Sequence, residues 1–304
     1  MDFSLSISWN AFRHEDGEKL LFEIKDLGFK EIELSFNLTP EILKGIRIGL
    51  KKYGLGISSV HNYCPIPVGL KREEALPDCY SMSSLDPEER RSAVTAAKIS
   101  IDTAASFNAR AVVLHCGRVE IADRTKDLIN LYTNGLKGTI EYLKLKNDIM
   151  AERDRKYEPY LKNTLLSLEE LSNYAKDKNV FLGVETRFYH REIPSLEETG
   201  IILEKFKGAN IFYWHDIGHA QVMENLGFYT QKECLELYGK NLLGVHLHDV
   251  KGCHDHLAPS KGEIGFALIK PYLQSETIKV IEAHHPATAE DIKSSKEFLE
   301  KIFA

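Results

Sequence analysis

Residues 211–219 read IFYWHDIGH, an apolar run that ends in Asp216 and His219, two residue types that commonly bind metal ions. Acids and imidazoles are costly to bury unless they are paired or bind a cation. The same pattern, a strand-like run ending in His, Glu or Asp, recurs at 112–117 (VVLHCG), 181–187 (FLGVETR), 242–249 (LLGVHLHD) and 280–285 (VIEAHH). Five strand ends with the same chemistry predict one shared site.

Strand-like segments alternate with stretches of helical periodicity along the whole chain. The eight segments are 3–8, 31–36, 57–63, 111–117, 181–187, 211–216, 242–249 and 278–284. Strands separated by helices predict parallel pairing through right-handed crossovers, and the number eight favours closure into a barrel. No GxGxxG follows the first strand, which removes the main dinucleotide-binding signature. We therefore expect an α/β fold, a (β/α)8 TIM barrel that forms a single domain over residues 1–304.

Three connections between these segments are longer than the others: 64–87, 118–160 and 250–264. The second is expected to hold one long helix and a further one, because 128–154 is rich in helix-forming residues. The first and third are rich in Pro and Gly, and we expect them to be loops that cover the site.

Composition places the chain among globular proteins, with 43% hydrophobic and 28% charged residues. No apolar stretch approaches the roughly 20 residues that span a bilayer, so no membrane partner is expected. The net charge of −6 offers no basic face, and nucleic acid is not the expected partner. Five scattered cysteines without a CxxC predict reduced thiols, and the N-terminal segment lacks the features of a secretory signal. We expect a cytoplasmic protein.

Catalytic groups of such barrels lie at the C-terminal ends of the strands and in the loops that follow. The candidates there are His61, His115, Glu185, Arg187, Asp216, His219, His246 and Glu282, and the 250–264 connection adds His254 and His256. A single histidine at a strand end is more often structural, but the joint occurrence favours a metal site. The neighbouring His215, His248, His284 and His285 are expected to point to the other side of the sheet, because strand side chains alternate.

The residue types leave the number of ions open between one and three. A set of Glu185, Asp216, His246 and Glu282 supplies three carboxylates and one imidazole, which suits Mn²⁺, Mg²⁺ or Co²⁺ and is also accepted by Zn²⁺. Two further sets are rich in imidazole and would favour Zn²⁺: His61 and His115 with Glu185, and His219 with His254 and His256.

This ligand set suggests a reaction. Two carboxylates beside a metal-bound α-hydroxycarbonyl can move a proton between adjacent carbons, one as general base and the other as the acid that returns the proton. The metal would stabilise the enediolate as negative charge develops. Glu185 and Glu282 are the predicted pair, and Arg187, two residues after Glu185, could steady an oxyanion or a carboxylate.

Over nearly its whole length the chain resembles the xylose isomerase-like superfamily, which holds sugar and sugar-phosphate isomerases and epimerases together with endonuclease IV. The resemblance is strongest in VFLGVETR, YWHDIGHA, LLGVHLHD, HLAPSKGEIGF and VIEAH. It implies metal ligands at Glu185, Asp216, His246 and Glu282, with the two glutamates also as the acid/base pair. The family commonly carries Asp-x-His in the loop after the metal-binding histidine, and His254 occupies the Asp place here.

The resemblance implies a metal-dependent isomerase or epimerase of a small sugar, a sugar phosphate or a related keto-polyol. Endonuclease IV, a multi-zinc phosphodiester hydrolase acting on abasic DNA, is the rival that shares the wider set of histidines. The run ETRFYHREI at 185–193 differs from that enzyme's Glu-Asn-Thr-Ala-Gly. A dehydratase or lyase of a polyol or keto acid and a non-catalytic sugar- or metal-binding barrel are further alternatives. Similar barrels are often dimers or tetramers, which leaves a homo-oligomer open.

Overall fold

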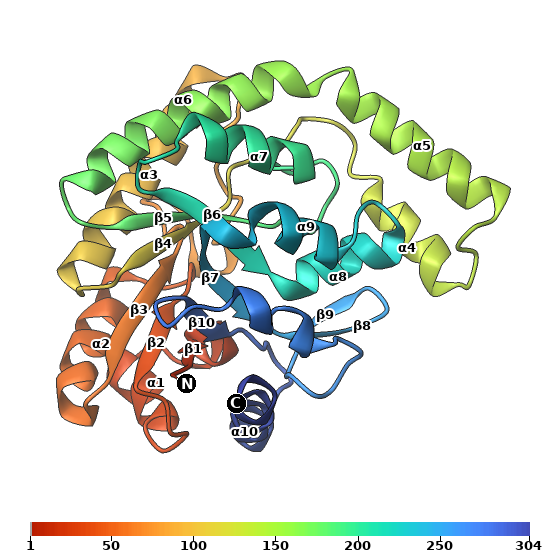
Figure 1. Cartoon of the computed structure of the whole chain (residues 1–304). Coiled ribbons are helices and arrows are strands. Elements are labelled where there is room, and N and C mark those ends of the chain that lie inside the picture. The colour runs from red at the N-terminus through yellow and green to blue at the C-terminus, as the bar shows by residue number, and fades with distance from the viewer. Residues whose placement is uncertain (1) are drawn as a thin grey trace.

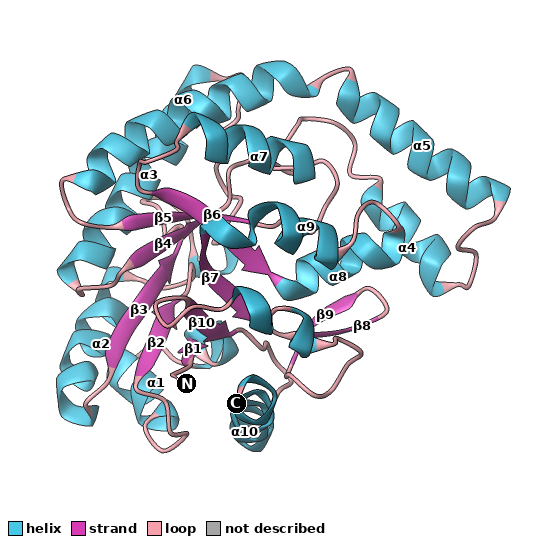
Figure 2. Ribbon diagram, viewed as in Figure 1, coloured by secondary structure: helices cyan, strands magenta, loops and turns pink. Residues whose placement is uncertain are grey.

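Eight short, buried strands close into a barrel in the computed structural model, which describes residues 2–304. The barrel strands are β1 (Ser4–Ser6), β2 (Glu31–Leu34), β3 (Gly56–His61), β4 (Ala111–Leu114), β5 (Phe181–Glu185), β6 (Ile211–Asp216), β7 (Leu242–Leu247) and β10 (Ile278–Ile281). All neighbours pair in parallel, in the order β1-β10-β7-β6-β5-β4-β3-β2 (Figure 2). The predicted (β/α)8 TIM barrel is confirmed.

Helices surround the barrel, as Figure 1 shows. They are α1 (Gly17–Ile24), α2 (Pro40–Tyr53), α3 (Pro87–Ser106), α4 (Thr125–Thr133), α5 (Ile140–Asp154), α6 (Tyr157–Lys176), α7 (Leu196–Lys205), α8 (Ile217–Leu226), α9 (Gln231–Tyr238) and α10 (Ala289–Phe303). Local sequence sets their ends: Thr39 caps the first turn of α2, and Gly54 ends that helix in the left-handed conformation. No helix within residues 2–304 is long and apolar enough to cross a membrane.

The long connections differ in how well they were predicted. The 118–160 connection holds the two expected helices, α4 and α5, and Figure 1 shows α5 extending away from the barrel. The 250–264 connection was predicted to be a loop, but it contains an antiparallel hairpin of β8 (Asp249–Lys251) and β9 (His254–Leu257). The Asp249 carboxylate stabilises the hairpin because it accepts hydrogen bonds from the backbone N–H groups of Val250, Ser260 and Ile264.

Trp214 fills the barrel interior directly beneath the C-terminal strand ends. It is fully buried on β6, and its ring centroid lies 5.1 Å from that of His246. A Cβ atom at Gly244 would lie 2.3 Å from the indole, and one at Gly183 would lie 2.8 Å from it. Glycine at these two positions therefore makes room for the indole, on which the polar groups at the strand ends rest.

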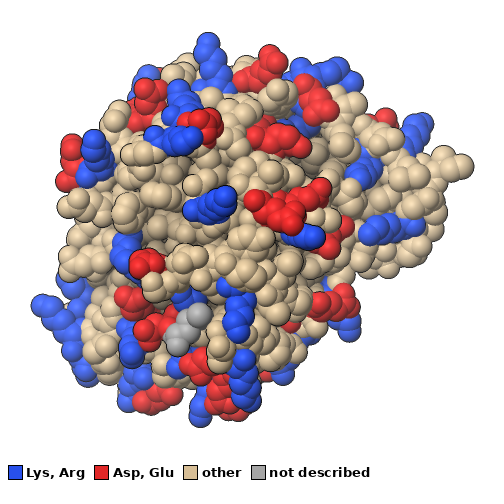
Figure 3. Space-filling model, viewed as in Figure 1, with Lys and Arg blue, Asp and Glu red and all other residues tan. Residues whose placement is uncertain are grey.

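Acidic and basic side chains are interspersed on the face of the molecule shown in Figure 3. No single basic patch dominates that face.

The two chain ends lie close together: the rings of Phe3 and Phe303 stack with their centroids 6.1 Å apart.

Candidate metal centre

Four buried side chains meet where β5, β6, β7 and β10 end. They are Glu185, Asp216, His246 and Glu282, and each offers a ligand atom within 4.8 Å of the other three. The parallel pairing explains their meeting, because Asp216 stands level with His246 in the β6–β7 register. Glu185 closes β5, and Glu282 follows the last residue of β10.

The imidazole of His246 lies at the centre of this quartet. Its Nδ1 atom is 2.6 Å from Glu185 Oε1, 3.0 Å from Glu282 Oε2 and 3.5 Å from Asp216 Oδ2. Its Nε2 atom lies 3.2 Å from Glu33, a fully buried acid on β2 that the sequence analysis missed. The signal was present in EIELSF, where Glu33 is an acid between two apolar residues of a strand.

Electrostatics keep the carboxylates of the quartet ionised. Burial alone would raise the pKa of Glu282, but the charge and hydrogen bond of His246 outweigh it and lower this pKa to about 2. Likewise, His115 and His246 overcome burial and hold the pKa of Glu185 well below its usual range. The histidines around Asp216 do the same for its pKa. Burial lowers the pKa of His246, yet the surrounding carboxylates raise it well above the usual value.

Asp216 shows that the quartet suits a cation. Its Oδ2 atom is buried and has no hydrogen-bond partner among residues 2–304. Buried polar atoms normally have a partner, and an unpaired carboxylate oxygen beside two further carboxylates is a ligand suited to a divalent ion. Three carboxylate oxygens and one imidazole nitrogen fit such an ion by number and by type.

A second group shares Glu185 with the quartet. His115 Nε2 lies 2.7 Å from Glu185 Oε2, His61 Nε2 lies 3.8 Å from the same oxygen, and all three side chains are buried. On its other side, His115 Nδ1 is 3.0 Å from the carboxylate of Asp78. Asp78 belongs to the 64–87 connection, so this loop does reach the site as expected. The residue itself was not predicted, because nothing in a loop sequence indicates where its side chain will lie.

Arg187 is buried, with 4% of its side chain exposed, and contacts three acids. Its guanidinium donates from Nη1 to Glu185 Oε2 at 2.8 Å, and from Nη2 to Asp78 at 3.2 Å and Glu192 at 3.0 Å. With both Nη atoms engaged by the protein, Arg187 holds Glu185 in a fixed orientation at the wall of the site.

Comparison with known proteins agrees with this architecture. The family model described as xylose isomerase-like TIM barrel matches residues 21–302. The chain belongs to the xylose isomerase-like TIM barrel family. No curated protein matches the chain in sequence.

Several solved structures align with almost the whole chain. A D-tagatose 3-epimerase-like protein has a TM-score of 0.68 and 20% identity, covering 99% of this chain and 97% of its own. An L-ribulose 3-epimerase has a TM-score of 0.71 and 16% identity, covering 100% and 95%. The D-psicose 3-epimerase of Clostridium cellulolyticum H10, solved with D-tagatose, has a TM-score of 0.68 and 13% identity, covering 100% and 99%. At these identities the likeness shows the fold alone.

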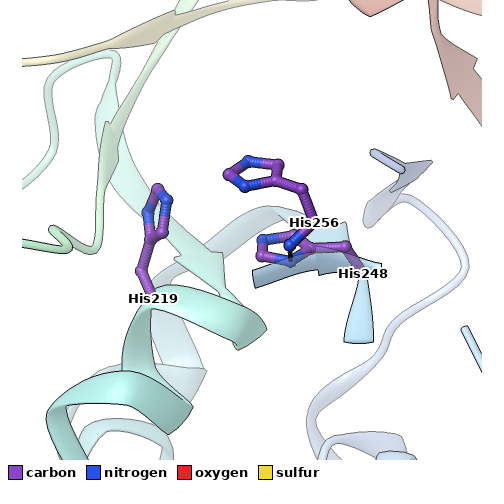
Figure 4. A group of neighbouring side chains, drawn as sticks. All are labelled: His219, His248 and His256. Atoms are coloured by element: carbon purple, nitrogen blue, oxygen red, sulfur yellow. Dashed lines mark hydrogen bonds between the residues drawn. The ribbon is translucent and has the colours of Figure 1, made fainter. Parts of the chain in front are cut away.

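A third group in this xylose isomerase-like barrel lies beside the quartet. It consists of His219 on α8, His248 after β7 and His256 on β9, whose ring nitrogens come within 4.8 Å of one another (Figure 4). The rings of His248 and His256 are stacked with centroids 4.1 Å apart, and His219 stands edge-on to both. His254 is exposed on the same hairpin and lies outside the group, whereas Asp255 Oδ2 lies 3.8 Å from His219 Nε2.

The expectation that His248 and His284 point away from the site is wrong. His248 Nε2 lies 2.9 Å from Asp216 Oδ1, and the His284 ring stacks on that of His256 at 3.9 Å. Each of them stands two positions after a quartet residue, His248 after His246 and His284 after Glu282, so an alternation with a period of two places them on the same side as the quartet. His215 lies within β6, where alternation also holds, and it bonds the Tyr213 hydroxyl instead at 2.7 Å.

Proposed function

We propose that the protein is a divalent-metal-dependent isomerase or epimerase of a small sugar, a sugar phosphate or a related keto-polyol. One observation supports this above all: two buried, ionised glutamates, Glu185 and Glu282, approach the same nitrogen of His246. They come from β5 and from the end of β10, which lie three places apart in the barrel. A carbon chain held between them would have one carboxylate available to each of two positions.

The quartet of Glu185, Asp216, His246 and Glu282 would hold the ion, with Mn²⁺, Co²⁺, Mg²⁺ and Zn²⁺ as the candidates. When bound, such an ion supplies a Lewis acid for the oxygens of an α-hydroxycarbonyl. One glutamate, in its ionised form, takes a proton from carbon, and the other, once it has itself bound a proton, gives that proton to the neighbouring position or the opposite face. Arg187 and His115 keep Glu185 oriented for this exchange. The solved sugar 3-epimerases of the same fold agree with the proposed substrate class.

A multi-zinc phosphodiester hydrolase of the endonuclease IV type is the second candidate. It is favoured by the two histidine groups beside the quartet, His61 with His115 and His219 with His256. The net charge of −6 offers little attraction for a strand of phosphates. A dehydratase or lyase would use the same glutamates on a substrate that carries a leaving group.

The deciding experiment joins a metal analysis to a substrate panel. Protein purified without chelators is expected to contain a divalent ion or to gain activity with Mn²⁺, Co²⁺ or Zn²⁺. It is also expected to convert at least one ketose or aldose, free or phosphorylated, into its isomer or epimer. Loss of water from the substrate would indicate the lyase instead, and cleavage of an abasic-site duplex that stops on chelation would indicate the nuclease. Absence of any bound or activating ion would overturn the proposal.

A further inference from the structure

The three imidazoles of His219, His248 and His256 are not equivalent, because their hydrogen bonds decide which ring nitrogen carries the proton. His219 Nδ1 lies 3.0 Å from the Thr186 carbonyl oxygen, an atom that can only accept, so Nδ1 is the donor. His256 Nδ1 likewise lies 2.9 Å from the Asp255 carboxylate. In the neutral form of both rings, Nε2 then carries the lone pair that a metal could use.

His248 is arranged differently. Its Nδ1 atom accepts a hydrogen bond of 2.9 Å from the backbone N–H of His256, so Nδ1 carries no proton. The ring proton is therefore on Nε2, which lies 2.9 Å from Asp216 Oδ1, an oxygen that can only accept. Both nitrogens of this fully buried ring are thus engaged, and no lone pair remains for an ion.

These contacts determine which oxygen of Asp216 faces the quartet. Oδ1 accepts two hydrogen bonds, one from His248 and one of 2.7 Å from the backbone N–H of His219. Oδ2 has no hydrogen-bond partner among residues 2–304 and lies 3.5 Å from His246 Nδ1. Two donors on one oxygen fix the plane of the carboxylate, and the other oxygen is directed at the place where an ion would bind.

We propose that His248 is a positioning residue of the metal site rather than one of its ligands. Its Nε2–H orients Asp216, and its Nδ1 connects that carboxylate to the β8–β9 hairpin through the backbone of His256. This inference rests on the proposed metal-dependent function. Hydrogen bonds to ligating groups typically change metal affinity 10- to 100-fold, and we expect an effect of that size.

Gly218 provides a second way to disturb the same contact. A Cβ atom at this position would lie 1.9 Å from Cε1 of His248, so any side chain here would displace the ring. Gly218 supplies no ligand atom and lies in the first turn of α8. Substitution by alanine should therefore weaken metal binding through His248 without removing any ligand.

The test combines calorimetric titration of Co²⁺ and Mn²⁺ with variants at these positions. His248→Ala and Gly218→Ala are expected to weaken binding about 10- to 100-fold. His248→Gln, whose amide N–H can reach Asp216, should stay within a few-fold of wild type. His215→Gln, at another fully buried histidine beside Asp216, controls for disturbance of the core and should not change the affinity.

Nitrogen NMR of the wild-type protein supplies a readout that needs no variant. His248 is expected to show the Nε2–H form with and without metal, and to show no scalar coupling to bound ¹¹³Cd²⁺. Such a coupling would make His248 a ligand and overturn the proposal, as would unchanged affinity in a folded His248→Ala variant. A wild-type protein that binds no divalent ion would instead overturn the metal-dependent function itself, together with this role.

Discussion

His246 Nδ1 lies 2.6 Å from Glu185 Oε1, although the two residues are 61 positions apart and their strands, β7 and β5, are separated by β6. The barrel makes this contact possible because parallel strands deliver their last side chains to the same end. The contact joins the two chemistries that the proposed function needs, an imidazole ligand and a carboxylate able to exchange a proton.

Glu282→Gln and Glu185→Gln should each lower turnover about 10²- to 10⁴-fold, because an amide cannot take or return the proton. Activity would be measured on the substrate identified in the panel, and circular dichroism would verify the fold. Glu297→Gln, an exposed acid on α10, is the matched control and should behave as wild type. Near-normal turnover in either site variant would remove that glutamate from the acid/base pair.

Metal binding should raise the thermal stability of the protein, since an ion bound only by the folded state stabilises it by about 2.7 kcal/mol at 100 times its Kd. Differential scanning calorimetry of chelated and Mn²⁺-loaded protein measures this as a rise in Tm. In Asp216→Asn the Oδ1 acceptor for the His219 N–H can be retained, while an NH₂ group replaces the unpaired Oδ2. The Tm rise should be lost in that variant, and its persistence would exclude Asp216 as a ligand.

One feature of the sequence predicted both the barrel and the meeting of the four quartet residues. Apolar runs identify buried strands, and a buried strand that ends in Asp216 or Glu185 carries a polar group that must find a partner. That inference needs only local sequence and the rule that parallel strands share one end. It also explains why Glu282 could be placed without knowledge of its neighbours.

Residues outside the strand ends were harder to predict. Asp78 reaches His115 from a long loop, and such a contact depends on the path of the chain through space. His248, by contrast, was predictable: it stands two positions after His246, and a period of two puts both side chains on the side of the site, where His248 contacts Asp216.

Gly244→Ala should destabilise the barrel, because the new methyl group would meet the Trp214 ring at 2.3 Å inside a packed core. Overpacking of this kind typically costs about 1–3 kcal/mol. Gly265→Ala is the control, since a Cβ atom there has nothing within 4 Å and the backbone φ of −83° suits alanine. Urea unfolding of the two variants should separate them, and equal stability would show that the indole can shift at little cost.

Acid should destabilise the protein partly through His190, whose ring stacks on that of Phe228 with centroids 4.3 Å apart. Its Nε2 atom is buried without a hydrogen-bond partner in the described residues 2–304. Burial, assisted by the positive charges of Arg153 and Lys146, lowers the pKa of His190 to about 3. The folded protein therefore resists protonation of this ring at pH values where the unfolded chain accepts it.

The sign of the effect follows from the two pKa values. Above pH 6.5, the approximate pKa of histidine in the unfolded chain, His190 is neutral in both the folded and the unfolded state and does not change the stability. Below that pH only the unfolded chain binds the proton, so the free energy of unfolding falls as the pH drops toward about 3. Between pH 7 and pH 5 the loss from this residue is about 2 kcal/mol. Urea unfolding at both pH values should show a smaller loss in His190→Gln than in wild type. His254→Gln, at an exposed position, should leave the loss unchanged. An equal loss in wild type and His190→Gln would show that the ring is protonated in the folded state as readily as in the unfolded chain.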